Sequence, residues 1–297
     1  MPDVGSDKPE KNRVTGGTLY LVSTPIGNLA DLSPRAVKVL AEVDFVAAED
    51  TRNTVRLLTH FGISRPLVSY HEHNKRERGG QIVEKLLEGQ SCALVSDAGT
   101  PAVSDPGEDL VALCAERGVP VTAVPGCCAA VTALTLSALP TGRFCFEGFL
   151  PAEKKARRAR LAALAREERT MLLHEAPHKL RATLSDLVET LGGGRRVALC
   201  RELTKRNEEV TRTTLEKAAA YYAENEPRGE YVLVIEGGAG EQNTEAPASA
   251  ALCALSPAEH AAYYEKAGLS RMDAIKAAAR DRGLPKNEFY RLLCEEK

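Results

Sequence analysis

The chain has 297 residues, enough for two domains with sizeable hydrophobic cores. Its 43% of hydrophobic and 27% of charged residues are typical of a globular protein and exclude a disordered or fibrous chain. The net charge of −2 does not by itself indicate a polyanionic partner, although charge can be concentrated locally. No stretch reaches the roughly 18 apolar residues of a membrane span, so we expect a cytoplasmic protein without a membrane partner.

The N-terminus and the cysteines support this view. The N-terminal segment lacks the apolar core of a secretory signal, and residues 1–16 are predicted to be disordered. The eight cysteines form no CxxC pair and mostly lie in apolar or alanine-rich segments. They are therefore interpreted as reduced thiols that pack as small hydrophobic side chains, and we predict neither disulfides nor a zinc site.

Strand-like and helix-like segments alternate through the first half of the chain. Strands are predicted at 19–23, 45–48, 66–70, 92–95 and 119–124, and helices at 34–41, 51–60, 80–87, 108–116 and 129–139. Repeated strand–helix units predict a parallel five-stranded sheet with helices on both faces. We place this N-terminal α/β domain at residues 17–142.

An aromatic run at 142–151 interrupts the alternation and is interpreted as the crossing into a second α/β domain, residues 143–237. Strands predicted at 171–174, 196–200, 210–214 and 229–235, with helices at 178–191 and 215–223, favour a mixed sheet. Residues 238–257 are predicted to be a flexible linker. Residues 258–297 are predicted to form a helical C-terminal extension with a helix start near Ser270, either a small helix-turn-helix or a packing appendage.

The loop at 96–107 is the most informative segment for function. It is polar, rich in glycine and proline, and follows a predicted buried strand, which is where open α/β sheets bind ligands. Loops at 24–29, 49–52 and 125–130 leave strands at the same edge, so we expect all four to converge on one crevice. The chain lacks GxGxxG, GxxxxGK[ST] and GxSxG motifs, which argues against dinucleotide, Walker-type and serine-hydrolase sites.

The carboxylates in these loops, Glu49, Asp50, Asp97 and Asp105, allow several roles. They would suit Mg²⁺, or the hydroxyl and ammonium groups of a small ligand. Asp50 is also placed to cap the helix that begins at the next residue.

Basic residues are concentrated in the second domain, either as a solvated helix face or as a rim that binds phosphates. They include Lys154, Lys155, Arg157, Arg158, Arg160, Arg166, Arg169, Arg195, Arg196, Arg201, Lys205, Arg206 and Arg212. His174 and His178 are separated by Pro177, which argues against a shared helical face, so no metal site is predicted.

Several motifs together resemble those of the small-subunit ribosomal RNA ribose-2′-O-methyltransferase I family, a branch of the tetrapyrrole methylase superfamily. They are the segments 24–29, 49–52, 96–107, 146–151, 175–178 and 201–205, within a resemblance over about residues 18–237. The resemblance implies two α/β domains of tetrapyrrole-methylase type with S-adenosylmethionine bound between them, and a homodimer. It also implies 2′-O-methylation of a cytidine in the decoding region, with the small ribosomal subunit or its rRNA as partner.

The resemblance and the loop positions give the candidate site residues. For the cofactor they are Pro25, Asp97, Ala98, Gly99, Thr100, Ser104, Gly126, Cys128 and Ala129. The catalytic candidates, as general base or electrostatic helper for a ribose hydroxyl, are Glu49, Asp50, Glu175 and Lys205. The RNA-binding candidates are Arg52, Arg157, Arg158, His178 and Arg201.

The chain departs from the family pattern at Cys127–Cys128, where Pro-Ser is more usual, and at Lys179, where arginine is more usual. The first departure leaves open what a hydroxyl at position 128 contributes. Three alternative functions also stay open: a tetrapyrrole C-methyltransferase, a Mg²⁺-dependent phosphohydrolase and a non-catalytic ribosome-assembly factor.

Overall fold

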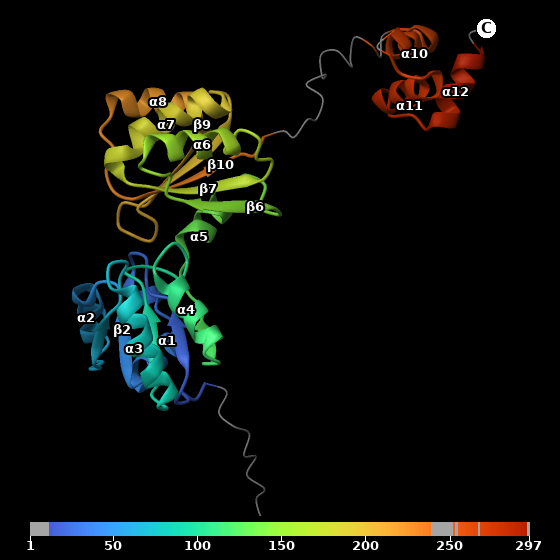
Figure 1. Ribbon diagram of the computed structural model, residues 1–297. Coiled ribbons are helices and arrows are strands. Elements are labelled where there is room, and N and C mark those ends of the chain that lie inside the picture. Colours follow the sequence, from blue (N-terminus) through green and yellow to red (C-terminus); the bar gives the residue numbers. More distant parts are fainter. Residues whose placement is uncertain (1–11, 239–251, 253–254, 267, 296–297) are drawn as a thin grey trace, which may run out of the picture. The chain divides into compact units, whose positions relative to one another are not determined.

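The computed structural model describes residues 12–238, 252, 255–266 and 268–295 (Figure 1). Most of the predicted disordered N-terminus and of the predicted linker lies outside these residues. The described residues up to 238 form one compact unit, and those from 252 onward form a second.

The first sheet has five parallel strands, as predicted. They are β1 (Leu19–Val22), β2 (Phe45–Ala48), β3 (Leu67–Ser69), β4 (Cys92–Val95) and β5 (Val121–Val124), in the order β3-β2-β4-β1-β5. The neighbouring strands β2 and β4 are buried along their whole length, which explains their uninterrupted apolar sequences.

Helices cover both faces of this sheet. The helices α1 (Pro34–Glu42) and α2 (Thr51–His60) pack on one face, and α3 (Lys75–Leu87) and α4 (Gly107–Glu116) pack on the other. A short 3-10 helix, η1 (Leu29–Asp31), precedes α1. Helix α3 begins earlier than predicted because Lys75 forms ion pairs with Glu72 (2.8 Å) and with Asp109 of α4 (2.6 Å), which stabilise its first turn.

The second sheet is mixed, as predicted. Its strands are β6 (Phe144–Gly148), β7 (Thr170–Glu175), β8 (Arg196–Arg201), β9 (Glu209–Thr214) and β10 (Tyr231–Ile235), in the order β6-β7-β10-β8-β9. Only β6 and β7 pair in parallel. Strand β6 was not predicted, because a bulge between Phe146 and Gly148 breaks the alternation of its side chains.

The two faces of the second sheet are covered by different parts of the chain. Helices α6 (Lys154–Leu164), α7 (Pro177–Leu191) and α8 (Leu215–Glu224) cover one face. On the other face, Ala133 and Leu134 of α5 (Ala129–Leu136) pack with Leu172 and Val234. Helix α5 directly follows β5, so it connects the two sheets, and the domain boundary at 142/143 stays a prediction.

The second unit contains α10 (Pro257–Lys266), α11 (Arg271–Asp281) and α12 (Lys286–Glu295), around a small core that includes Ile275 and Phe289. The helix start predicted near Ser270 is confirmed, because Ser270 Oγ accepts a hydrogen bond from the backbone N–H of Asp273 (3.3 Å). In the described ranges, no helix is long and apolar enough to span a bilayer.

Candidate functional site

One hydroxyl group ties together three loops at the carboxyl edge of the first sheet. Thr100 Oγ1, in the loop after β4, donates to the carbonyl of Cys127 after β5 (2.9 Å). Ser23 Oγ, at the end of β1, lies 3.1 Å from Thr100 Oγ1 and donates to it, since the Thr100 proton is already used. Thr24 and Gly99 add two backbone hydrogen bonds, of 2.9 and 3.1 Å. The predicted cofactor-binding loops therefore meet at one edge.

Glycine allows two of these loops to approach closely. Gly99 has a φ of +82°, in the left-handed region that L side chains rarely adopt. A Cβ atom on Gly126 would lie 2.9 Å from Ser23 Cβ, which is closer than carbon atoms pack. Larger residues at these positions would separate the loops.

Asp105 shapes the 96–107 loop. Its carboxylate accepts hydrogen bonds from the backbone N–H groups of Ala102 (2.9 Å) and Gly107 (2.7 Å). Ala102 and Ser104 have φ values of 64° and 60°, so this loop holds two L residues in left-handed conformations. Asp105 thus has a structural role, and the loop holds Ser104 in a fixed, exposed position.

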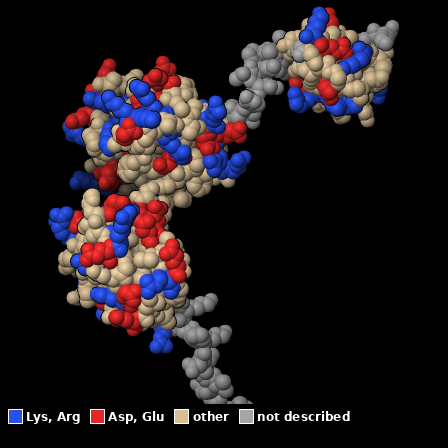
Figure 2. Space-filling view, viewed as in Figure 1, with Lys and Arg blue, Asp and Glu red and all other residues tan. Residues whose placement is uncertain are grey.

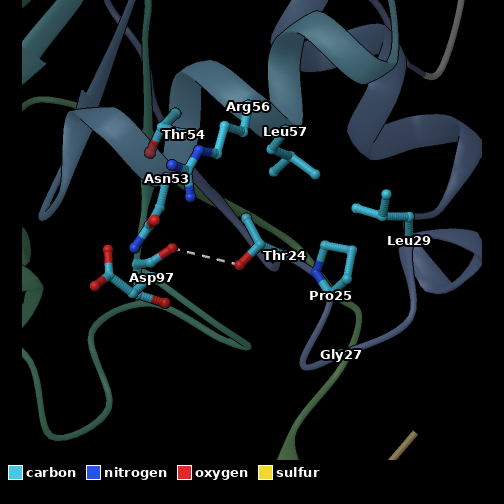
Figure 3. A pocket seen from close by; sticks show the side chains of 10 residues that line it. Thr24, Pro25, Gly27, Leu29, Asn53, Thr54, Arg56, Leu57 and Asp97 are labelled. Carbon is cyan, nitrogen blue, oxygen red and sulfur yellow. Dashed lines mark hydrogen bonds between the residues drawn. The ribbon is translucent and has the colours of Figure 1, made fainter. Parts of the chain in front are cut away.

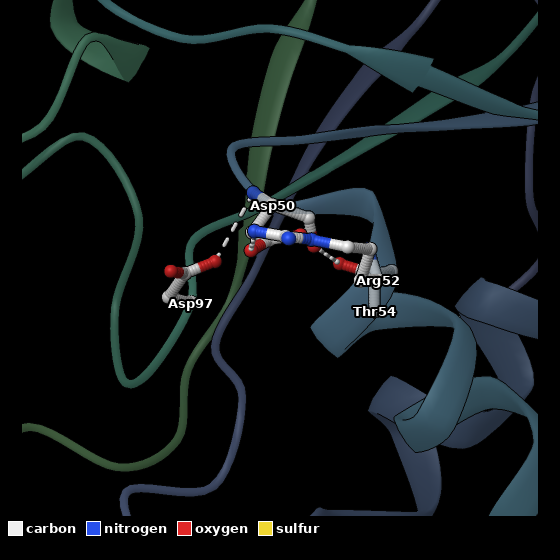
Figure 4. Close-up of polar contacts among 4 residues, drawn as sticks. All are labelled: Asp50, Arg52, Thr54 and Asp97. Carbon is white, nitrogen blue, oxygen red and sulfur yellow. Dashed lines mark hydrogen bonds and ion pairs between the residues drawn. The ribbon is translucent and has the colours of Figure 1, made fainter.

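Asp50 caps helix α2 (Figure 4). Its Oδ1 accepts the Arg52 backbone N–H (2.8 Å), and the Arg52 guanidinium adds two hydrogen bonds of 3.0 and 2.7 Å. These hydrogen bonds from Arg52 lower the pKa of Asp50 to about 2. Asp97 Oδ1 accepts the Asp50 backbone N–H (3.1 Å), which joins the loops after β2 and β4.

Glu49 has the opposite electrostatic environment. Burial raises the pKa of Glu49, and the nearby carboxylates of Asp97 and Asp105 raise it further. Among the residues with described positions, no group of three His, Cys, Asp or Glu side chains is arranged to hold a metal ion.

A cavity of about 260 Å³ opens between the loop after β1 and helix α2 (Figure 3). Its lining includes the predicted site residues Pro25 and Asp97, and also Thr24, Gly27, Leu29, Asn53, Thr54, Arg56, Leu57 and Ser96. Sequence reasoning missed Asn53 and Arg56, whose only signal is that they lie three residues apart on the polar side of α2.

Lys205, in the loop after β8 of the second sheet, lies against the loop after β1 at the carboxyl edge of the first sheet. A Cβ atom on Gly27 would lie 2.4 Å from Lys205 Cγ and 2.8 Å from Thr204 Oγ1, so the loops after β1 and β8 are in contact. Burial lowers the pKa of Lys205, but hydrogen bonds from its Nζ to Glu202 and Glu230, each 2.9 Å, more than offset this effect and raise it. Lys205 is therefore a cation at neutral pH.

The hydrogen bonds of Glu175 are to residues of the second domain. Glu175 is 4% exposed, and its carboxylate accepts hydrogen bonds from the Ala176 backbone N–H (2.9 Å) and the Thr183 hydroxyl. Thr183 Oγ1 in turn accepts from Arg157 (2.9 Å), whose Nε also donates to Asp186 (2.7 Å). Glu175 and Arg157 thus belong to a hydrogen-bonded chain beneath helix α7.

The other predicted RNA-binding residues differ in how available they are. Arg158 and His178 are exposed, and Arg158 has no partner within the described part of the chain. Arg201 pairs with Glu209 (2.8 Å), and Arg52 pairs with Asp50. Figure 2 shows lysine and arginine side chains gathered over the helices of the second sheet, with acidic side chains between them.

Comparison with known proteins identifies the family. The model of the tetrapyrrole (corrin/porphyrin) methylases matches residues 18–219. Ribosomal RNA small subunit methyltransferase I of Halalkalibacterium halodurans is 48% identical over 280 residues, which cover 94% of this chain and 96% of that protein. The protein of the same name from Escherichia coli O157:H7 is 45% identical and covers 95% of this chain and 96% of its own length.

Solved structures agree on the fold. Uroporphyrin-III C-methyl transferase from Thermus thermophilus, complexed with S-adenyl homocysteine, aligns with a TM-score of 0.54 and 19% identity over 74% of this chain and 97% of that chain. The chain therefore belongs to the tetrapyrrole methylases and, among them, to the ribosomal RNA small subunit methyltransferase I family.

Proposed function

We propose that this chain transfers a methyl group from S-adenosylmethionine to the 2′-hydroxyl of a cytidine in the decoding region of small-subunit rRNA. Family membership makes the chain a methyltransferase, and relatives at 45–48% identity that cover nearly the whole chain support rRNA as its substrate. The cytidine and its 2′-hydroxyl are the finer part of the proposal and depend on the family resemblance of the loops.

The loops at the carboxyl edge fit S-adenosylmethionine. Gly99 and Gly126 let the loops after β1, β4 and β5 pack together at one edge, and Asp97 presents an exposed carboxylate there to a positively charged or hydroxyl-bearing ligand. Thr204 Oγ1 is buried beside Gly27 and lacks a hydrogen-bond partner in the described chain, so it is available to a ligand. The bound cofactor supplies an electrophilic methyl group on a sulfonium.

Glu49 is the best general base among the four catalytic candidates. The observation that supports this assignment is its raised pKa. A ribose hydroxyl must lose its proton as its oxygen attacks, and a carboxylate with a raised pKa accepts that proton better than one with a lowered pKa. Asp50 has its pKa lowered to about 2 and is bound by Arg52. Lys205 is held in its charged form.

Glu175 is the remaining candidate, and its buried hydrogen bonds to Thr183 and Ala176 suit a structural role better. We therefore assign proton removal to Glu49. Lys205, which lies at the contact between the loops after β1 and β8, is proposed to stabilise the developing negative charge on the acceptor oxygen.

Exposed basic residues support RNA binding by the second domain. Arg158 and His178 are proposed to contact phosphates without reading bases.

We also propose that the enzyme works in the cytoplasm as a homodimer. Its two α/β domains are proposed to divide at residues 142/143. Sedimentation velocity of the full chain tests the dimer.

The substrate test uses radiolabelled S-adenosylmethionine with three acceptors: purified small ribosomal subunits that lack the modification, naked small-subunit rRNA, and uroporphyrinogen III. We expect label in RNA and none in the tetrapyrrole. Label in the tetrapyrrole alone would replace this proposal with the C-methyltransferase alternative. Cofactor binding by calorimetry with no transfer to any acceptor would favour a binding-only assembly factor.

A further inference from the structure

The aromatic run that the sequence left without a function forms a small cluster on the second sheet. Phe149 follows β6 directly and is 59% exposed, which is unusual for phenylalanine. Its ring packs edge-to-face against His174 of β7, with ring centroids 5.6 Å apart. Phe146 of β6 contacts the same histidine in the same manner, with ring centroids 5.2 Å apart.

The backbone fixes where Phe149 lies. The bulge in β6 and the φ of +61° at Gly148 turn the chain immediately before it. Leu150, immediately after it, is buried in the core beneath α6 and α7. Because both neighbours are held by the fold, the exposed ring is positioned before any ligand binds.

This position adjoins the proposed cofactor site. A Cβ atom on Gly148 would lie 3.0 Å from Ser104 Oγ, so the residue before Phe149 touches the loop that follows β4. A few residues later, helix α6 begins with the exposed cations Lys154 and Lys155. An exposed ring between a ligand-binding loop and a cationic helix is the arrangement with which proteins bind unpaired nucleotides.

His174 is the ring against which both phenylalanines pack. Its Nε2 is buried and has no hydrogen-bond partner in the ranges that the structure describes. Burial also lowers the pKa of His174, so the ring is neutral at physiological pH and offers an uncharged surface for Phe149 to pack on.

We propose that Phe149 is a stacking platform for an unpaired base of the RNA substrate, supported edge-on by His174 and Phe146. This inference rests on the proposed function, because it assigns the substrate of the same crevice a contact outside the cofactor-binding loops. A base on the ring would hold the RNA next to the Ser104 loop, while the lysines of α6 contact its phosphates. The platform tolerates any base, because every base has a π-face.

Substitutions at position 149 separate stacking from plain apolar contact. Binding of purified small ribosomal subunits is measured for Phe149→Ala, Phe149→Leu and Phe149→Tyr. The alanine and leucine variants should bind about tenfold to a hundredfold more weakly, whereas the tyrosine variant stays within about twofold of wild type. Tyr221→Ala is the matched control, since Tyr221 is an aromatic residue of α8 that is 57% exposed.

A second readout follows stacking directly. The chain contains no tryptophan, so Phe149→Trp introduces a single tryptophan at the platform, which can be excited at wavelengths that the tyrosines do not absorb. We expect its emission to be quenched when subunits are added and to be unchanged by S-adenosylhomocysteine alone. S-adenosylhomocysteine should bind all variants with wild-type affinity in calorimetry.

Three results would overturn the inference. The first is wild-type affinity of Phe149→Ala for subunits, and the second is equal binding by the leucine and tyrosine variants. The third is conversion of a dimer to a monomer by Phe149→Ala, because the ring would then belong to an interface between copies of the chain. If the wild-type chain neither binds nor methylates subunits, the proposed function fails and this inference fails with it. If the wild-type chain methylates them and the position-149 variants bind normally, the inference alone fails.

Discussion

The hydroxyl of Thr100 provides a sharp test of how the carboxyl-edge loops are held. Thr100→Val keeps the side-chain shape but removes the hydrogen bonds to Cys127 O (2.9 Å) and Ser23 Oγ (3.1 Å). A hydrogen bond contributes about 1 kcal/mol net, and a carbonyl left without its donor adds to the loss. We therefore expect the free energy of unfolding to fall by about 1–3 kcal/mol.

The loops that loosen are those proposed to hold the cofactor, so binding should weaken as well. If about 1.4 kcal/mol of the loss appears in binding, the affinity for S-adenosylhomocysteine falls about tenfold. Urea denaturation and calorimetry measure the two effects. Thr135→Val is the matched control, because Thr135 is exposed and its hydroxyl only donates within α5, to the carbonyl of Thr132.

The result that refutes this reasoning is a Thr100→Val variant with wild-type unfolding free energy and wild-type cofactor affinity. A variant that is destabilised but binds normally would limit the role of Thr100 to folding. Equal losses in the Thr135→Val control would mean that any threonine-to-valine change in this region has the effect, and the connection among the three loops would lose its support.

Three further predictions concern other parts of the site. Cys128 occupies the N-cap of α5 without a side-chain cap, so Cys128→Ser should raise the free energy of unfolding by about 1 kcal/mol in urea denaturation. Arg157→Ala should lower the free energy of unfolding by about 1–3 kcal/mol, because Asp186 loses its hydrogen-bond partner. Arg158→Ala should leave urea denaturation unchanged and weaken subunit binding. Destabilisation by Arg158→Ala together with unchanged stability of Arg157→Ala would contradict these assignments. The lowered pKa of Asp50 means that its charge stabilises the fold above the ordinary value of 3.8, and that this contribution is lost as the pH falls to about 2. Asp50→Asn keeps a cap acceptor but not the charge, so the variant should be less stable than wild type at neutral pH and equal to it near pH 2. A constant difference in the free energy of unfolding, measured by urea titrations at several pH values, would contradict this.

The first sheet could be predicted from the sequence because its signals are local. Continuous apolar runs such as Phe45–Ala48 and Cys92–Val95 mark strands buried on both faces, and the polar loops after them lie at one edge once the strands are parallel. The positions of the strands thus give the positions of the loops, and these give the position of the crevice, without knowledge of distant contacts. The position of the Ser96–Gly107 loop followed in the same way.

The second half of the site depends on distant contacts that no local pattern reveals. Arg157 and Arg158 are neighbours in one basic helix, and only the position of Asp186 determines that the first is paired and the second is exposed. The hydrogen bond that Glu175 accepts from Thr183 likewise depends on how helix α7 packs back on strand β7. Strand β6 escaped prediction because its bulge disrupts the two-residue period.

The same limit explains why the wall of the cavity was missed. Asn53 and Arg56 look like ordinary solvent-facing residues of α2, and only the approach of the loop after β1 makes them part of a cavity. The packing of α5 against the second sheet could not be predicted either, because each helix was assigned to the sheet of the strand that precedes it.

The central claim is that this chain methylates one ribose of small-subunit rRNA with Glu49 as the base. The most direct measurement is mass spectrometry of small-subunit rRNA from a bacterial strain that lacks its own methyltransferase I and expresses either the wild-type chain or its Glu49→Gln variant. We predict one 2′-O-methylcytidine in the decoding region with the wild-type chain, and its loss with a variant that still binds S-adenosylhomocysteine. Unmodified rRNA with the wild-type chain, or full modification with Glu49→Gln, would contradict the account.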